Sequence, residues 1–318
     1  MVQTAEARTV KGAEAFMMDV VAPEALSTGE VIQLPDGRAG VNASATEVAS
    51  GDVAGLHTSG QFSFLKTASV VILDGAPIYW DRSANTATPL RAAAGADFYL
   101  GVAVGDVVAA GGTVVVDLNV QPAYTIDLLR DPSVDIAVGD ATLVNRGGAM
   151  VFNILATSEA EKIDAFSIQS IPVTVPFIVE GRMASFVIGT DNTVDMNVGI
   201  ANATHATSAD TITEAVFVHL DETLDIFLES DDGTTEVAAT DSTVDCVDNT
   251  YFDFAIDARD LTDIQIYING VLMLGSTVFA LGDATGPMKL AVHVEKTTGT
   301  ATGELRVSKL AVRTPDVT

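Results

Sequence analysis

Cysteine, tryptophan, histidine and basic residues are all scarce in this sequence. The 318 residues include one cysteine (Cys246), one tryptophan (Trp80) and four histidines. A single cysteine excludes an intrachain disulfide. No two histidines have the short spacing of a zinc motif. Cys246 has no basic neighbour to activate its thiol, so we expect it to be a small buried apolar residue.

The sequence also lacks long apolar runs. The N-terminus has no basic segment followed by an apolar one, so we expect no signal peptide, assembly in the host cytoplasm and release by lysis. No uncharged apolar stretch is long enough to span a bilayer. Lys and Arg number 16 against 43 Asp and Glu, for a net charge of -27. Such a surface repels phosphate backbones and anionic lipids, so we expect neither nucleic acid nor membrane as a partner.

Short apolar segments separated by turn residues are abundant. Hydrophobic residues make up 48% of the chain and aromatic residues 6%. Val and Ile, which suit pleated sheets, recur in runs that end at Gly, Pro, Asn or Asp, such as residues 29–34 before Pro35-Asp36-Gly37. Only residues 158–166 have a helix-like pattern, and an edge hairpin fits them equally well. The sequence therefore predicts an all-β fold.

The strand pattern changes along the chain and predicts two domains. We expect a flexible arm over residues 1–9, a small β-barrel or sandwich over 10–120, a linker over 121–133, and a larger antiparallel jelly-roll sandwich over 134–318. Residues 1–120 hold 13 acidic and 6 basic residues, and the rest of the chain holds 30 and 10. This difference in charge indicates that the two domains have different surroundings.

Residues 10–118 carry a series of short motifs in a characteristic order and spacing. They are Val10-Lys11-Gly12, Ala22-Pro23, Gly29-Glu30-Val31, Gly40-Val41, Gly60-Gln61-Phe62, Gly75-Ala76-Pro77-Ile78-Tyr79-Trp80-Asp81 and Phe98-Tyr99-Leu100-Gly101-Val102-Ala103. This region resembles the small β domain of a family of tailed-phage head proteins. The resemblance implies a capsid decoration, or cement, protein.

Residues 134–313 carry a second set of motifs. They are Val198-Gly199-Ile200-Ala201-Asn202, Glu229-Ser230-Asp231-Asp232-Gly233-Thr234, Phe254-Ala255-Ile256-Asp257-Ala258 and Ile266-Tyr267-Ile268-Asn269-Gly270-Val271. This region is similar to the concanavalin-like, or laminin-G-like, jelly rolls of phage structural proteins. Many such domains bind glycans or calcium, but the fold alone does not confer that activity.

Candidate residues for catalysis or metal binding are few. Jelly-roll glucanases place three carboxylates on alternate positions of one strand, whereas the run from Glu229 to Asp232 lacks the third and ends in a turn, so we interpret it as a solvated hairpin. Asp191, Asp195 and Asp210 offer oxygen ligands for Ca²⁺, but the EF-hand spacing is absent and a polar turn between strands is the simpler interpretation. We therefore predict no enzyme and no required cofactor.

Histidines and loop residues offer further candidates. Asn202 and His205 lie in a polar loop and are candidates for ligand contact, with a plain loop as the alternative. His219 and His293 lie within strands, and we interpret both as structural.

Contact with the capsid or with other copies is assigned to Val10, Lys11, Tyr79 and Trp80. Trp80 has two alternative roles, as an exposed docking anchor or as a side chain that fills the core of the small domain.

The function that this combination predicts is that of a structural virion protein. It would decorate and stabilise the outer surface of a bacteriophage capsid as a homotrimer, with the major capsid protein as partner and the jelly roll projecting outward. The alternatives are a carbohydrate-binding adhesin that uses the jelly-roll loops to bind host-surface glycans, and a glycoside hydrolase, which the missing carboxylate set disfavours.

Overall fold

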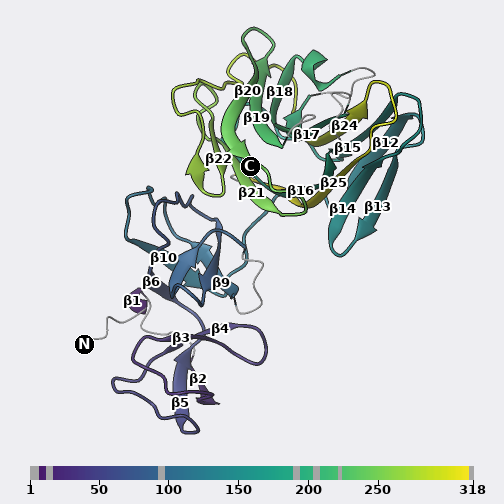
Figure 1. Cartoon of the computed structure of the whole chain (residues 1–318). Helices are drawn as coiled ribbons and strands as arrows, with labels where there is room; N and C mark the ends of the chain where they lie inside the picture. The colour runs from purple at the N-terminus through teal and green to yellow at the C-terminus, as the bar shows by residue number, and fades with distance from the viewer. Residues whose placement is uncertain are drawn as a thin grey trace. The chain divides into compact units, whose positions relative to one another are not determined.

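The computed structural model describes residues 7–11, 17–91, 97–188, 194–202, 208–220 and 224–314. The chain forms two compact units, residues 1–123 and 124–318, and each is built from antiparallel sheets (Figure 1). Within the described residues the only helix is the single turn η1 (Ala209–Thr211). The expected all-β fold is thus confirmed. No helix in the described part of the chain is long and apolar enough to cross a membrane.

The first unit contains a six-stranded and a four-stranded sheet. In the six-stranded sheet the order is β1 (Ala7–Lys11), β6 (Gln61–Leu65), β10 (Thr113–Leu118), β9 (Phe98–Ala103), β7 (Pro77–Asp81) and β8 (Thr86–Thr88). In the four-stranded sheet it is β2 (Met17–Val21), β5 (Val53–His57), β4 (Ala39–Asn42) and β3 (Val31–Gln33).

Alternation of apolar and polar residues explains why these segments form sheets with one buried face. In β6 the side chains of Phe62 and Phe64 are buried while Gln61 and Ser63 are half-buried, as expected for a strand with a period of two residues. Phe64 packs edge-on against Trp80, with ring centroids 6.0 Å apart. Residues of β3 and β4 join the same apolar core, so both sheets contribute to it.

The second unit is a sandwich of two larger sheets. One has the order β13 (Thr142–Arg146), β14 (Ala149–Ile154), β25 (Gly303–Arg313), β16 (Phe177–Ile188), β21 (Phe252–Ala258), β22 (Gln265–Ile268) and β23 (Val271–Leu272), with β11 (Ile126–Asp127) paired to β25. The other has the order β12 (Pro132–Val138), β15 (Glu161–Ser167), β24 (Lys289–Lys296), β17 (Val194–Ala201), β18 (Glu214–Leu220), β19 (Asp225–Asp232) and β20 (Glu236–Asp245). A single apolar core contains residues of both sheets.

The boundary between the units, after Ala123, falls within the expected linker over 121–133, and most of that segment belongs to the second unit. The amide of Thr125 donates to the carbonyl of Val312, and the amide of Leu128 donates to that of Leu310, both at 2.9 Å. Pro132 begins β12, which is an edge strand, where the missing amide hydrogen of proline does not break a ladder. These hydrogen bonds make the chain from Tyr124 onward part of the second unit.

Two other expectations differ from the structure. The segment 158–166, for which a helix and an edge hairpin fitted equally, supplies most of strand β15, which lies between β12 and β24. Residues 7–9 of the expected arm belong to β1, which pairs with β6. In both cases pairing with a strand distant in sequence decides the conformation.

Candidate functional site

The outward face of the β12–β20 sheet carries ionisable side chains that are buried. Asp164 on β15 lies beside His293 on β24, His293 beside Asn197 on β17, and Asn197 beside His219 on β18. Val198 and Val218, one position along, point into the sandwich core. The polar row therefore crosses four neighbouring strands on the face away from the core.

His293 lies between two carboxylates. Its Nδ1 is 2.5 Å from Asp164 Oδ1 and its Nε2 is 3.2 Å from Glu295 Oε2, while Lys162 Nζ is 3.1 Å from Asp164 Oδ2. Burial alone would lower the pKa of His293, but the two carboxylates outweigh burial and raise the pKa to about 9. The two carboxylates therefore favour the charged form of His293, which in turn offsets part of their buried negative charge.

His219 lies in a similar setting at the other end of the row. Its Nε2 is 2.7 Å from Asp195 Oδ1, and its Nδ1 is 3.5 Å from Glu229 Oε2. Burial opposes the charge, yet these two carboxylates raise the pKa of His219 to about 11. Burial also raises the pKa of Glu229, as do the charges of Asp195 and Asp210, against the opposing effect of His219.

Asp210 completes this cluster from outside the sheet. It belongs to η1, and one donor atom each from Asp210, His219 and Glu229 lie within 4.8 Å of one another. In the part of the chain that the structure describes, this is the one group of at least three such side chains with metal-ligand spacing. Asp210 is exposed, whereas His219 and Glu229 are 7% and 9% exposed.

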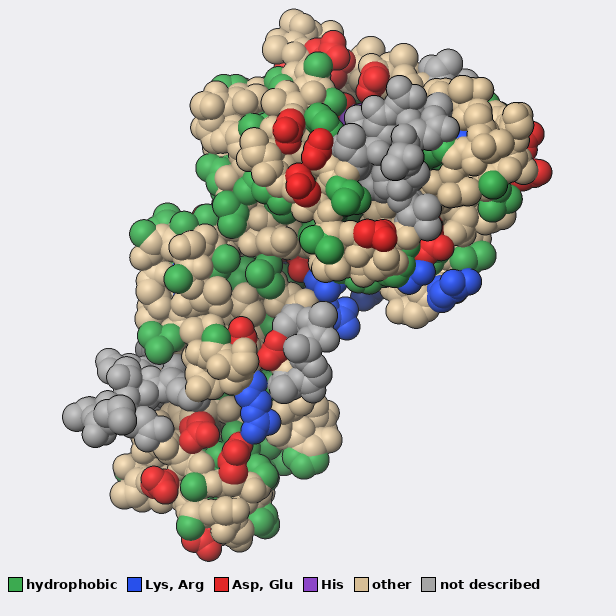
Figure 2. Space-filling model, viewed as in Figure 1, with side chains coloured by type: hydrophobic (Ala, Val, Ile, Leu, Met, Phe, Trp, Pro, Cys, Tyr) green, Lys and Arg blue, Asp and Glu red, His purple; other side chains and the backbone are tan. Residues whose placement is uncertain are grey.

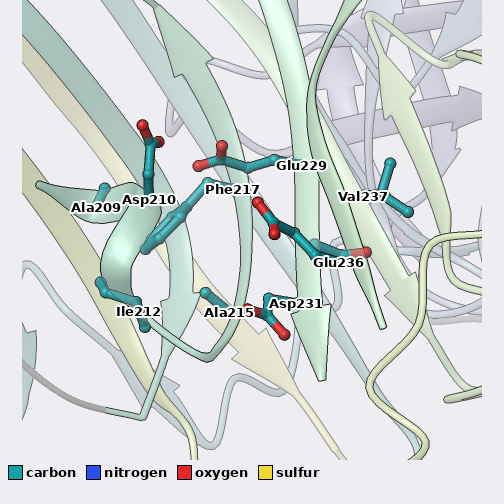
Figure 3. A pocket seen from close by; sticks show the side chains of 10 residues that line it. Ala209, Asp210, Ile212, Ala215, Phe217, Glu229, Asp231, Glu236 and Val237 are labelled. Atoms are coloured by element: carbon teal, nitrogen blue, oxygen red, sulfur yellow. The ribbon is translucent and has the colours of Figure 1, made fainter. Parts of the chain in front are cut away.

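A small recess that is open to solvent, with an internal volume of about 20 Å³, reaches Asp210 and Glu229 of this cluster. It is lined by Ala209, Asp210, Ile212, Ala215, Phe217, Glu229, Ser230, Asp231, Glu236 and Val237. Figure 3 shows the Glu229 side chain reaching from its strand toward Asp210, whereas Asp231 lies farther down the recess. The recess therefore brings solvent to one side of the cluster.

Several polar atoms in this region have no hydrogen-bond partner among the described residues. They are both side-chain atoms of Asn197, both ring nitrogens of His219, Oε1 of Glu229, Oδ1 of Asp195, Oδ2 of Asp164 and Nε2 of His293. Asn197 is fully buried. Buried polar atoms are nearly always paired, so this part of the sheet has unused capacity for polar contacts.

The structure brings together two of the three aspartates that sequence analysis proposed for a cation. Asp195 contacts His219, and Asp210 lies near Glu229. Asp191 and His205 lie outside the described residues. Asn202, the other candidate for ligand contact, donates its side-chain amide to Glu214 Oε2 at 2.6 Å, which gives Asn202 a role in holding the strand end.

The interpretation of residues 229–232 as a solvated hairpin was wrong. The turn occurs at Gly233, whose φ is +86°, but Glu229, Ser230 and Asp232 belong to β19 and are buried. Their burial comes from packing against β18, η1 and the segment around Asp283, whose amide donates to Asp232.

His219 and Glu229 are the functional candidates that sequence reasoning missed. A signal was present for His219, because it alternates with Val216 and Val218 and so had to lie on the face opposite to the core. No local signal existed for Glu229 or for its proximity to Asp210, since the two are brought together by tertiary packing alone.

The proposed contact residues of the first unit have different environments. Val10 and Lys11 lie in β1 beside a register shift against β6. Tyr79 is half-buried and packs edge-on against Tyr99, with centroids 5.7 Å apart. Trp80 is 1% exposed, so it fills the core of this unit, which is the second of the two roles considered for it.

Comparison with known families identifies the class of protein. We expected the first unit to resemble a phage capsid decoration protein. Residues 12–118 match a family model described as phage cement protein, which supports that expectation. The first unit therefore carries the sequence pattern of the phage cement family, and the match does not extend into the second unit. This match supports a structural role in the phage virion and association with the capsid.

Solved structures resemble the chain only distantly. The potassium-bound carbohydrate recognition domain of Emp46p has 9% identity and a TM-score of 0.41, covering 59% of this chain and 91% of that one. A carbohydrate esterase from the Shiga toxin-encoding bacteriophage phi24B has 12% identity and a TM-score of 0.40, covering 61% and 99%. Likenesses at this level carry no argument about function. No curated protein matches the sequence.

Proposed function

We propose that this protein decorates and stabilises the outer surface of a phage head. The first unit would bind the major capsid protein, and the second unit would project from the shell. One observation supports this division of roles above all: the cement family match over residues 12–118 falls entirely within the first unit, which has its own apolar core.

The physical basis of stabilisation is linkage between binding and assembly. A partner that binds the assembled shell but not free subunits stabilises the shell, by about 2.7 kcal/mol for each site at a free concentration of one hundred times Kd. A homotrimer at a local three-fold position would attach to several capsid subunits at once. Attachment at several points raises the effective affinity of each.

The outward face of the four-stranded sheet is a suitable contact surface in the first unit. Met17 and Val21 on the edge strand β2 are 51% and 63% exposed, and Val53 on β5, which is paired with Val21, is 65% exposed. Exposed apolar groups that cluster in this way often mark interaction sites. We include this surface with Val10, Lys11 and Tyr79 among the candidate capsid contacts.

The charge of the second unit supports an outward position. The 198 residues from 121 onward carry 30 acidic and 10 basic residues, and Figure 2 shows acidic side chains over the visible face of the second unit. A layer of negative charge at the virion surface would keep particles apart by repulsion.

Sedimentation with phage heads tests the proposal. Full-length protein is mixed with expanded heads, with unexpanded proheads and with free capsid subunits, and the pelleted fraction is measured. We expect saturable binding to expanded heads only, together with a higher melting temperature of the decorated shell. Cryo-electron microscopy of the decorated heads would then show whether three copies meet at each local three-fold position.

Two outcomes of the sedimentation experiment would contradict the proposed function. If the protein pellets with none of these particles, the decoration function is wrong. Binding to phage tails without binding to heads would also overturn it.

A further inference from the structure

We propose that His219, Glu229 and Asp210 form a binding site for a divalent transition-metal ion, with Asp195 orienting the imidazole. This site lies in the second unit, and it is independent of the capsid function proposed for the first unit. The argument depends on the geometry of the cluster, on its unpaired atoms and on the recess that reaches it.

The distances in the cluster match those between ligands of one metal ion. Two ligands bound to Zn²⁺ at about 2.0–2.2 Å in tetrahedral geometry are about 3.4 Å apart. His219 Nδ1 and Glu229 Oε2 are 3.5 Å apart. Asp210 offers a carboxylate oxygen within 4.8 Å of the other donors, and because Asp210 is exposed its side chain is free to move closer.

The orientation of His219 is the second part of the argument. Its Nε2 lies 2.7 Å from Asp195 Oδ1, which leaves Nδ1 directed toward Glu229. Metal-binding histidines commonly donate their other ring N–H to a carboxylate, which fixes the ring and makes it a better ligand. Binding of the metal would displace the hydrogen of Nδ1, since only a neutral imidazole nitrogen coordinates a metal ion.

Unpaired buried atoms point to a missing ligand. Both ring nitrogens of His219 and Oε1 of Glu229 have no hydrogen-bond partner among the described residues, although the two residues are only 7% and 9% exposed. Asn197, fully buried beside His219, has none for either side-chain atom. This second observation distinguishes the cluster from an ordinary group of surface acids.

The donor set indicates the class of metal. One imidazole nitrogen with two carboxylates suits Zn²⁺, Mn²⁺ or Co²⁺, whereas Ca²⁺ and Mg²⁺ take oxygen ligands. Three protein ligands leave a coordination position open toward the recess. A water molecule or an oxygen of a polar ligand would occupy that position.

Metal binding by the full-length protein tests the site. Protein freed of metal with a chelator is titrated with Zn²⁺ by calorimetry and with Co²⁺ by visible absorption, with Ca²⁺ and Mg²⁺ for comparison. We expect one Zn²⁺ per chain, Co²⁺ absorption bands typical of nitrogen and oxygen ligands, and weaker binding of Ca²⁺ and Mg²⁺.

Three variants examine the assignment of roles. Asp210→Asn and Glu229→Gln remove a ligand and should weaken Zn²⁺ binding at least about tenfold, and Asp195→Asn, which removes the orienting carboxylate, should weaken it about 10–100-fold. Asp210 is exposed, so Asp210→Asn tests the site even if the buried variants fold poorly.

Asp231→Asn is the matched control. Asp231 lines the same recess and lies two residues from Glu229 on β19, but it is not part of the cluster. Asp231→Asn removes the same charge as Asp210→Asn but no proposed ligand. Its Zn²⁺ affinity should therefore stay within about twofold of the wild type. The proposal is overturned if the wild type binds neither Zn²⁺ nor Co²⁺. It is also overturned if Asp231→Asn weakens binding as much as Asp210→Asn, because general attraction to a negative surface would then explain the binding.

Discussion

Some buried charges in this protein are paired with several partners at once. Glu180 on β16 is an example, since its carboxylate accepts hydrogen bonds from Tyr124, Lys309 and Arg313. Burial would raise the pKa of Glu180, but the charges of Lys309 and Arg313, with the hydrogen bonds from Lys309 and Tyr124, outweigh burial and lower the pKa to about 2. The partners come from β25 and from the start of the second unit, so this one side chain connects three segments.

The lowered pKa of Glu180 predicts a loss of stability in acid. Because the folded pKa lies below the unfolded value of 4.5, the stabilisation is fully present above pH 4.5 and is lost as the pH falls through about 2. The difference corresponds to about 3 kcal/mol in the free energy of unfolding. Glu180→Gln, which lacks this ionisation, should be about 3–5 kcal/mol less stable at pH 7 and approach the wild type near pH 2, as measured by urea unfolding.

Glu304→Gln serves as the control for the pH experiment. Glu304 pairs with Arg306 at a partly exposed position, so its loss should cost about 1 kcal/mol or less. If the difference in unfolding free energy between the wild type and Glu180→Gln were the same at pH 7 and at pH 2, the lowered pKa of Glu180 would be contradicted.

At the level of elements, one strand can present two surfaces with different roles. β17 and β18 direct Val198 and Val218 into the core and Asn197 and His219 to the opposite face, which is where the proposed metal site lies. β2 in the first unit has Met17 and Val21 directed outward. β2 lies at the edge of its sheet, and no described strand pairs with its outer edge.

The outward face of β2 and β5 should contribute to head binding. Replacing Val21 and Val53 together by Glu would put two negative charges on an apolar contact surface, and we expect the affinity for expanded heads to fall at least about tenfold. The unfolding midpoint should change little, because both side chains are more than 60% exposed. Sedimentation with heads over a range of protein concentrations measures the effect.

Val278→Glu is the matched control for this pair. Val278 is 57% exposed and belongs to the second unit. Its replacement by Glu should leave head binding unchanged. If the variant with both Val21→Glu and Val53→Glu bound expanded heads with wild-type affinity, the face of β2 and β5 would not be part of the capsid contact.

For the whole molecule, the division into two units is the main property. The apolar core of the first unit, around Phe62, Phe64 and Trp80, is distinct from the sandwich core around Phe152, Phe177 and Phe254. Separate cores allow separate cooperative transitions. One unit carries the cement family pattern, and the other carries the polar face with the metal-site cluster.

Tryptophan fluorescence should therefore report the unfolding of the first unit alone. Trp80 is the only tryptophan and is buried in that unit, whereas circular dichroism reports strands of both. We expect Glu180→Gln to shift the circular dichroism transition to lower urea and to leave the fluorescence transition in place. A shift of both transitions by the same amount would show that the two units unfold as one.

The sequence by itself determined the all-β fold class, the resemblance of the first part of the chain to the cement family and the presence of two β units. Alternating Val and Ile runs that end at Gly, Pro and Asp are local signals, and a strand such as Gln61–Leu65 shows its buried face in its own residues. Burial of Cys246 followed from composition and neighbours in the same way, and the residue is 3% exposed.

Tertiary structure alone decided where polar residues meet. Asp195, Asp210, His219 and Glu229 come from four elements, and no spacing in the sequence records their proximity. The same holds for the start of the second unit at Tyr124, which depends on hydrogen bonds to residues almost 190 positions later, and for Trp80, whose burial depends on Phe64. Local patterns specify which face of a strand is apolar, but only the pairing of distant strands determines what lies beside a polar side chain.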